Sequence, residues 1–362
     1  MIQIAKPLIG KEEEQAVLDV LKSGIIAQGP KVEEFEKNFA DYCTVKYAVA
    51  VHSGTAALHL ALMAMDIKEG DEVITTPFSF IASANCILYV NAKPVFADID
   101  EKTFNISPDS IIEKITDKTK AIIPVHLYGQ PCDMKAIMKI AQDYNLKILE
   151  DACQAHGAEY ENKWVGSFGE AAAFSFYPTK NMTTSEGGML TTNDKDIAEK
   201  AKIFRNHGQI KRYEHEFLGY NLRMTDICAA IGIEQLKKLD KFNEKRIENA
   251  QYLSSKLKNI KGIEVPYVAD NVKHVFHQYT IKIENGIRDE VNKKLNESGI
   301  GTGIHYPIPI NGQPFYKKIK CNADETPVAK EMAKKVLSLP IHSSITRENL
   351  DYITEKLDEF LK

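Results

Sequence analysis

Short apolar runs alternate with segments of helical periodicity through the first two thirds of the chain. The runs that predict buried strands are EVITT (72–76), KPVFADI (93–99), KAIIPVHL (120–127) and LKILED (146–151). Between them, segments such as GTAALHLALMAM (54–65) and DMKAIMKIAQDYN (133–145) carry apolar residues at helical spacing. This alternation predicts an α/β fold in which a mostly parallel sheet is flanked by helices.

The pattern changes after Thr225. Residues 225–259 form one helical pattern without proline, which is long enough to join two domains. Beyond it we expect a strand at VFHQYTIKIE (275–284), a helix at RDEVNKKLNESG (288–299) and a strand at IGTGIHYPIPI (300–310). The sequence therefore predicts a large domain over residues 1–238 and a smaller C-terminal α+β domain over residues 239–362.

Composition narrows the classes of protein that fit this chain. A hydrophobic share of 44% and a charged share of 27% over 362 residues are typical of a globular protein. The net charge of -4, without a Lys/Arg block, does not favour a nucleic-acid or membrane surface. The N-terminus lacks a secretory apolar core, and the six cysteines form no CxxC pair. We expect a cytoplasmic protein with reduced thiols and no metal site.

Residues with chemical potential follow several of the predicted strands. In a sheet of this kind, ligands bind beyond the carboxyl ends of the strands. The candidates at those ends are Ser53-Gly54-Thr55 after KYAVAVH, the run Phe78 to Phe80 after EVITT, Asp151 at the end of LKILED, and Lys180 after AAFSF. Three of these candidates also fit ordinary roles: a helix cap for Ser53-Gly54-Thr55, a helix cap or structural acid for Asp151, and an exposed loop lysine for Lys180.

Together these groups match the needs of one cofactor, pyridoxal phosphate. A glycine at a helix start lets free amides approach a phosphate. A buried carboxylate such as Asp151 needs a partner, and a protonated ring nitrogen would be one. A lysine at a crowded strand end, such as Lys180, can lose its proton and act as a nucleophile. The set therefore predicts a pyridoxal phosphate site.

Longer stretches of the chain carry a family resemblance. VHSGTAALHLAL (51–62), ILEDACQAHGA (148–158), FSFYPTKNMTTSEGGML (174–190) and GYNLRMTDICAAIG (219–232) occur in the order in which the family has them. The chain resembles the DegT/DnrJ/EryC1/StrS sugar aminotransferases, a branch of the fold type I pyridoxal phosphate enzymes. Many relatives have TTGEGG where this chain has TTSEGG, and Ser185 fits there unless its φ is positive.

The resemblance implies roles around the cofactor ring. Lys180 matches the lysine that binds the cofactor's aldehyde and moves protons between the carbons of cofactor and substrate. Asp151 matches the acid on the pyridine nitrogen. Gln154 matches the residue near the ring and its phenolic oxygen, and Phe80 matches the aromatic residue stacked on the ring.

The resemblance also implies a homodimer whose active sites lie at the subunit interface. The backbone amides of Gly54 and Thr55 and the hydroxyl of Ser175 match the phosphate contacts. Asn221 matches a phosphate contact donated by the other subunit. The residues that match substrate-facing positions are Arg223, His305 and Tyr306.

The implied reaction moves an amino group from an amino acid, with L-glutamate as the expected donor, to a keto group of a nucleotide-linked sugar. The product would serve amino-sugar and polysaccharide biosynthesis. TTSEGG looks closer to enzymes for 4-keto sugars, and 3-keto sugars are the alternative. A sugar dehydratase of the same fold is disfavoured because such relatives carry histidine where Lys180 stands. A non-catalytic regulator is disfavoured because Lys180 and Asp151 are both present.

Overall fold

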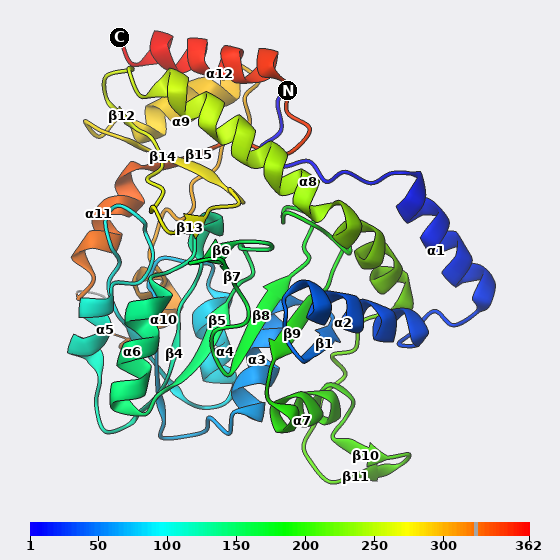
Figure 1. Ribbon diagram of the computed structural model, residues 1–362. Coiled ribbons are helices and arrows are strands. Elements are labelled where there is room, and N and C mark those ends of the chain that lie inside the picture. The colour runs from blue at the N-terminus through cyan, green and yellow to red at the C-terminus, as the bar shows by residue number, and fades with distance from the viewer. Residues whose placement is uncertain (322–324) are drawn as a thin grey trace.

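A seven-stranded sheet forms the centre of the larger part of the molecule in the computed structural model, which describes residues 1–321 and 325–362 (Figure 1). In spatial order the strands are β1 (Tyr47–Val51), β9 (Gly188–Thr192), β8 (Ala171–Ser175), β5 (Lys147–Asp151), β4 (Thr119–Ile123), β2 (Glu72–Thr75) and β3 (Lys93–Phe96). Strand β9 runs antiparallel to both of its neighbours, and the other pairs are parallel. The predicted α/β fold with a mostly parallel sheet is confirmed.

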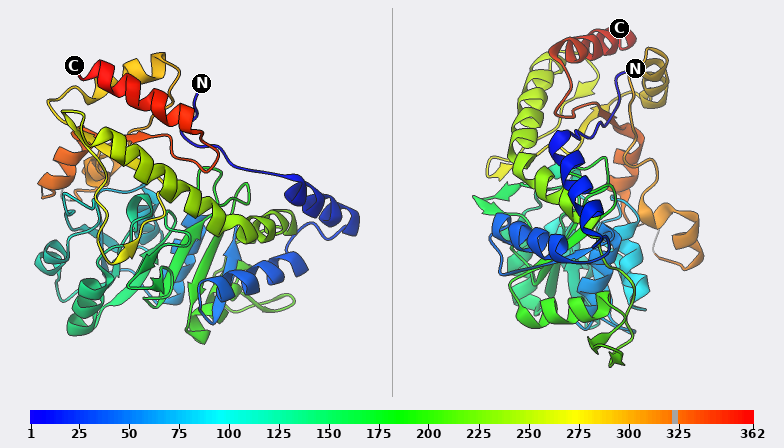
Figure 2. Two further views of the ribbon diagram at one scale, coloured as in Figure 1. Left: turned by 45° about the horizontal axis from the view of Figure 1, so that its top comes forward. Right: turned by 90° about the vertical axis from the view of Figure 1, so that its right-hand side faces the viewer.

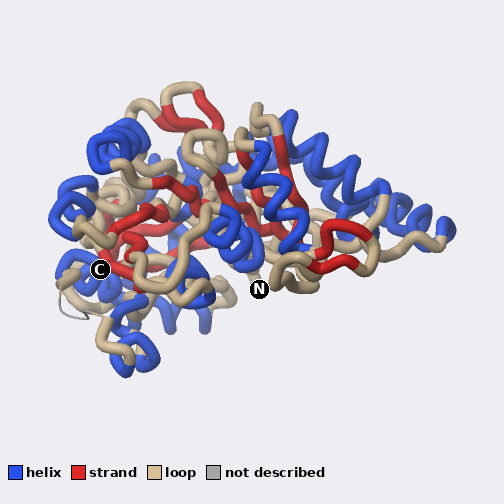
Figure 3. Tube along the Cα trace, turned by 90° about the horizontal axis from the view of Figure 1, so that it is seen from below, coloured by secondary structure: helices blue, strands red, loops and turns tan. Residues whose placement is uncertain are grey.

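Helices cover both faces of this sheet, as Figure 3 shows from below. Successive strand residues point to opposite faces, so Val73 packs into one apolar cluster and Ile74 into another. The helices on the Val73 side are α3 (Gly54–Ala64), α4 (Ala82–Tyr89) and α7 (Lys195–Arg205). The helices on the other side are α2 (Pro30–Tyr42), α5 (Pro108–Lys114) and α6 (Met134–Tyr144). Both faces are apolar because both are covered.

Helix α8 (Asp226–Leu257) joins the larger part to a smaller one, as both views of Figure 2 show. Its first half packs on α1 (Lys11–Ser23) and α2. Its last turns join an apolar cluster with a three-stranded sheet and two helices. These elements are β12 (Ile263–Glu264), β14 (Tyr279–Ile283), β15 (Val336–Leu339), α9 (Arg288–Glu297) and α12 (Arg347–Phe360). The boundary predicted between residues 238 and 239 falls inside α8.

The remaining elements are short. They are the sheet of β6 (Glu159–Tyr160), β7 (Lys163–Trp164) and β13 (Val272–Lys273), the projecting hairpin of β10 (Gln209–Lys211) and β11 (Glu214–His215), the turns η1 (Leu127–Gly129) and η2 (Ile310–Gly312), and helices α10 (Pro314–Lys318) and α11 (Pro327–Lys335). None of the described helices is both long enough and apolar enough to cross a membrane.

The strand predicted for residues 300–310 is wrong. Only isolated bridges form there, at Ile300 with Ile2 and at Gly303 with Ser338. The apolar run resembles a strand, but its two prolines have no N–H group to donate to a sheet. The segment crosses instead toward the larger part, which brings His305 and Tyr306 to the cavity described below.

Candidate active site

A cavity of about 620 Å³ opens beyond the carboxyl ends of β5 and β8 and beside the start of α3. Two segments of the smaller part, around His277 and His305, complete its wall. The sequence-predicted site residues that line it are Gly54, Thr55, Phe80, Asp151, Gln154, Ser175, Lys180, His305 and Tyr306. The fold therefore gathers in one place residues that lie as far apart in the chain as Gly54 and Tyr306, as the ligand-binding rule for α/β sheets predicts.

Lys180 lies in the irregular segment that follows β8. Its backbone N–H donates to the carbonyl of Tyr177 at 2.9 Å. Burial lowers the pKa of its amine, and the nearby Cys153 and Asp151 oppose that shift. Within the described ranges, its Nζ has no hydrogen-bond or ion-pair partner. A lysine in this setting keeps a larger neutral fraction than an exposed one, and the neutral amine is the nucleophile.

Asp151 supplies a carboxylate that is only 4% exposed. Its Oδ2 accepts a hydrogen bond from Ser83 Oγ at 2.7 Å, and its Oδ1 accepts one from the Cys153 N–H at 3.2 Å. Ser79 Oγ lies 3.0 Å from Ser83 Oγ. Both serines also line the cavity. The sequence analysis missed both serines. Ser79 precedes α4 and Ser83 lies in its first turn, and neither position carries a local sign of the distant acid.

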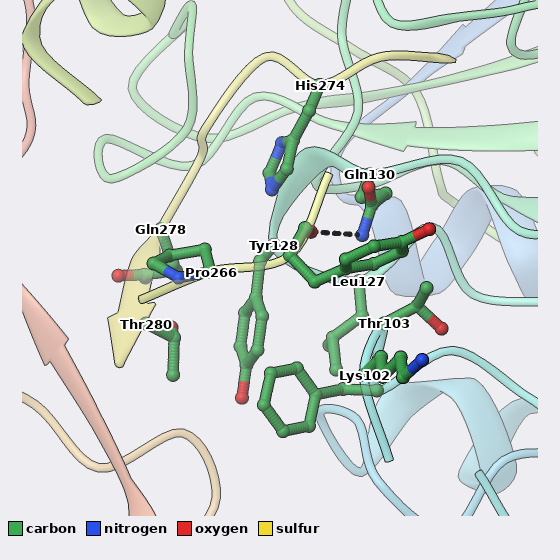
Figure 4. A pocket seen from close by; sticks show the side chains of 11 residues that line it. Lys102, Thr103, Leu127, Tyr128, Gln130, Pro266, His274, Gln278 and Thr280 are labelled. Carbon is green, nitrogen blue, oxygen red and sulfur yellow. Dashed lines mark hydrogen bonds between the residues drawn. The ribbon is translucent and has the colours of Figure 1, made fainter. Parts of the chain in front are cut away.

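Gln154 is held from two sides. Its Oε1 accepts a hydrogen bond from the Tyr128 N–H at 2.9 Å, and its Nε2 lies 3.5 Å from Tyr306 Oη. The hydroxyl of Tyr128 donates to the carbonyl of His305. Figure 4 shows Tyr128 beside Thr280 in the small pocket between the two parts of the molecule. Gln154 is therefore fixed in orientation by residues from both parts.

The start of α3 offers a cradle for an anion. Ser53 Oγ accepts from the Ala56 N–H, which leaves the amides of Gly54 and Thr55 without an acceptor inside the helix. A Cβ at Gly54 would lie 2.7 Å from Ser175 Cβ and 2.8 Å from Cys153 Sγ. Glycine thus lets the helix start pack against the end of β8. Free amides and the helix dipole favour a phosphate at this place.

The turn that closes the site is tight. A Cβ at Gly188 would lie 2.4 Å from the carbonyl carbon of Ser53, so only glycine lets β9 pass the start of α3. Ser185 adopts φ +73°. Serine was expected to fit the place of the family's glycine only if its φ were negative, and this φ is positive. The chain therefore holds a serine in the left-handed region there, at a steric cost.

Phe80 and the histidines complete the wall. Phe80 is 58% exposed, so one face of its ring is free to cover a planar ligand. Burial, with the nearby Lys180, lowers the pKa of His305 to about 4, and its Nδ1 lies 2.9 Å from Ser338 Oγ. Burial and Lys180 also hold the pKa of His277 well below its usual value. His277 is a wall residue that the sequence analysis missed. It fell within the strand predicted for residues 275–284, whereas the observed strand β14 begins at Tyr279, two residues after it.

Asn221 and Arg223 lie outside this cavity. Asn221 forms an antiparallel bridge with Asn206, and Arg223 Nη1 donates to Asn206 Oδ1 at 2.6 Å. Both follow the β10–β11 hairpin, whose Tyr213 is 81% exposed. The role of Asn221 in a partner's phosphate site and the role of Arg223 toward substrate both stay predictions.

The fold and this site place the protein among the aminotransferases. It is 43% identical to the spore coat polysaccharide biosynthesis protein SpsC of Bacillus subtilis, over 98% of this chain and 96% of that protein. It is 41% identical to the GDP-perosamine synthase of Caulobacter vibrioides, over 99% of this chain and 98% of that one.

Solved structures agree with these sequence matches. The putative sugar aminotransferase Spr1654 of Streptococcus pneumoniae, in its PLP form, superposes with a TM-score of 0.94 at 29% identity, covering 100% of this chain and 99% of that chain. The model of the DegT/DnrJ/EryC1/StrS aminotransferase family matches residues 7–358. The chain belongs to this family.

Proposed function

We propose that this protein transfers an amino group from L-glutamate to the keto group of a nucleotide-linked sugar. The observation that carries the proposal is the amine of Lys180, which has no hydrogen-bond or ion-pair partner among the described residues and lies in a cavity that also holds Asp151 and the start of α3. The relatives support it, because one is a GDP-perosamine synthase and another belongs to polysaccharide biosynthesis. We further propose that the reaction takes place in the cytoplasm and serves amino-sugar and polysaccharide biosynthesis.

The residues present fit pyridoxal phosphate. Lys180 would bind its aldehyde, Asp151 its ring nitrogen, and the amides of Gly54 and Thr55 with the Ser175 hydroxyl its phosphate. The structural support for this fit is the buried amine of Lys180 and the cradle that a Cβ at Gly54 would fill. When bound, the cofactor supplies an electron sink for the carbon that loses its proton.

The chain's own groups would handle protons and orientation. Lys180 Nζ, with its lowered pKa, accepts a proton from the donor's α-carbon and returns one to the sugar carbon that gains nitrogen. Asp151 places its carboxyl group in the cavity. His277 and His305 stay neutral at physiological pH because their pKa values are lowered. Phe80 covers the site at its rim and limits the entry of water.

Several finer points belong to the same proposal. We favour a 4-keto sugar from the TTSEGG form of the turn, with a 3-keto sugar as the alternative. We propose a homodimer in which Asn221 reaches the partner's phosphate site and Arg223, His305 and Tyr306 face substrate. We also propose a functional division into residues 1–238, which bind the cofactor, and residues 239–362, which close the cavity.

The test is the visible absorption spectrum of the purified protein after incubation with pyridoxal phosphate. We expect a visible absorption band from the bound cofactor, and we expect this band to disappear when L-glutamate is added. Lys180→Ala should not show this change, whereas Lys261→Ala, at an exposed position, should behave like the unaltered protein. A glutamate response that survives in Lys180→Ala refutes the role of the lysine. A coloured protein that ignores glutamate but deoxygenates a sugar would support the dehydratase alternative.

A further inference from the structure

A buried pair of amide side chains begins at the residue that follows Lys180. Asn181, the next residue in the chain, donates from its Nδ2 to Asn243 Oδ1 at 2.8 Å and to the carbonyl of Val275 at 3.0 Å. Asn181 is 4% exposed and Asn243 is 0% exposed. Both protons of the Asn181 amide are thus used, and its side chain has one fixed orientation.

Asn243 connects this pair to helix α8. Its own Nδ2 donates to the carbonyl of His156 at 2.8 Å. One turn further along α8, Arg246 Nη1 donates to the carbonyls of Phe276 at 3.1 Å and His277 at 3.3 Å. A single turn of α8 therefore holds the residue that follows Lys180 and the backbone of His277, which lies in the wall of the same cavity.

Lys180 needs such support because it lies outside regular structure. The segment after β8 has neither helix nor strand at residues 176–187. On its N-terminal side, Lys180 is fixed by its N–H bond to the carbonyl of Tyr177. On its C-terminal side, the Asn181 side chain is the nearest anchor. A reacting group has to be held to within about 0.5 Å, and a long lysine side chain cannot achieve this on a mobile backbone.

We propose that Asn243 is a positioning residue that holds Lys180 in place through the side chain of Asn181. The inference rests on the proposed function, in which Lys180 is the reacting amine. Asparagine suits the position because it presents an acceptor to Asn181 and a donor to His156 at once. A Cβ at Gly157 would lie 2.6 Å from Asn243 Nδ2, so the neighbouring chain is shaped around this amide.

The experiment measures Lys180 itself in the protein freed of cofactor. Reductive methylation with formaldehyde and cyanoborohydride is followed over a range of pH, and mass spectrometry gives the labelling of Lys180 relative to the exposed Lys261. In Asn243→Ala we expect the pH midpoint of Lys180 labelling to move upward, because the amine leaves its buried place. Asn181→Ala should move it by the same amount, and the double variant should move it no further.

A matched control lies on the same helix. Asn249 is 1% exposed and makes no hydrogen bond to Asn181, so Asn249→Ala removes a buried amide of equal size without touching the pair. It should leave the Lys180 midpoint unchanged. In the loaded enzyme, Asn243→Ala should lower kcat about 100-fold, the typical cost of a 1 Å displacement, with a much smaller change in KM for the sugar.

An unchanged Lys180 midpoint in a folded Asn243→Ala protein overturns the proposal, and so do additive effects of the two single changes. Should Asn243→Ala fail to fold, Asn243→Asp keeps the size of the side chain and the acceptor for Asn181, while Asn181→Asp loses both donors. The proposal then requires Asn181→Asp to lose more kcat than Asn243→Asp, and the reverse order overturns it. A wild-type protein that ignores glutamate would refute the proposed function but would leave the labelling result standing.

Discussion

Replacing Gly54 by alanine tests whether the start of α3 is the phosphate cradle. The added Cβ would lie 2.7 Å from Ser175 Cβ and 3.2 Å from Ser175 Cα. The closer contact is about 0.8 Å inside the ordinary carbon–carbon distance of about 3.5 Å. Ser175 ends a central strand and cannot rotate its backbone away. The first turn of α3 therefore has to move away from β8.

This movement separates the two halves of the cradle, because Gly54 and Thr55 lie on one side and the Ser175 hydroxyl on the other. Overpacking of this kind costs about 1–3 kcal/mol. Where this cost weakens cofactor binding by about 1.4–2.8 kcal/mol, the Kd for pyridoxal phosphate rises about 10- to 100-fold. The remainder lowers the stability of the cofactor-free protein.

The assay is a titration of the cofactor-free protein with pyridoxal phosphate, followed by absorbance, beside thermal unfolding without cofactor. Gly10→Ala is the control, because its Cβ would meet only the flexible ends of Glu12, Glu13 and Lys238. It should leave the Kd unchanged. A Gly54→Ala protein with reduced stability but an unaltered Kd would refute the placement of the phosphate at this helix.

Two further predictions concern buried polar groups. Ser83→Ala removes the donor to Asp151 Oδ2 and should lower the free energy of unfolding of the cofactor-free protein by about 1.5–3 kcal/mol; an unchanged urea midpoint would contradict it. Burial lowers the pKa of His156 to about 3. Between about pH 6.5 and 3, His156 is therefore protonated in the unfolded chain but stays neutral in the folded protein. Stability should fall as the pH falls through this window, and His156→Leu should flatten the fall in urea unfolding measured at each pH; an equal slope in both proteins would count against it.

The sequence predicted those site residues whose position follows from local pattern. Lys180 and Asp151 each follow a short apolar run, and such runs are reliable signals where both faces of a sheet are buried. The family resemblance then added residues with no local chemistry of their own, such as Gln154. The supporting contacts had no such signal, because Ser83 and Asp151 are 68 residues apart and Asn181 and Asn243 are 62 apart.

Two departures have local physical causes. Residues 300–310 have the apolar composition of a strand, and only the proline positions argue against it. At Ser185 the sequence showed that the fit depends on the sign of φ, but it did not give that sign. A backbone angle depends on the packing of the whole turn and not on the residue type alone. The first departure therefore follows from residue type, and the second from tertiary packing that the sequence does not display.

Helix α8 has a consequence for modular design. It runs 32 residues, roughly 48 Å at 1.5 Å per residue, and it contributes Leu239 to one apolar cluster and Leu253 to another. Asn243 and Arg246 lie between them. A chimaera that exchanges residues 239–362 with those of a relative would splice a foreign helix half onto α8 and would replace both amide and guanidinium anchors. Residues 239–362 therefore cannot be exchanged as an independent unit. Recombination points outside α8 would preserve the contacts that support Lys180 better than a cut between residues 238 and 239.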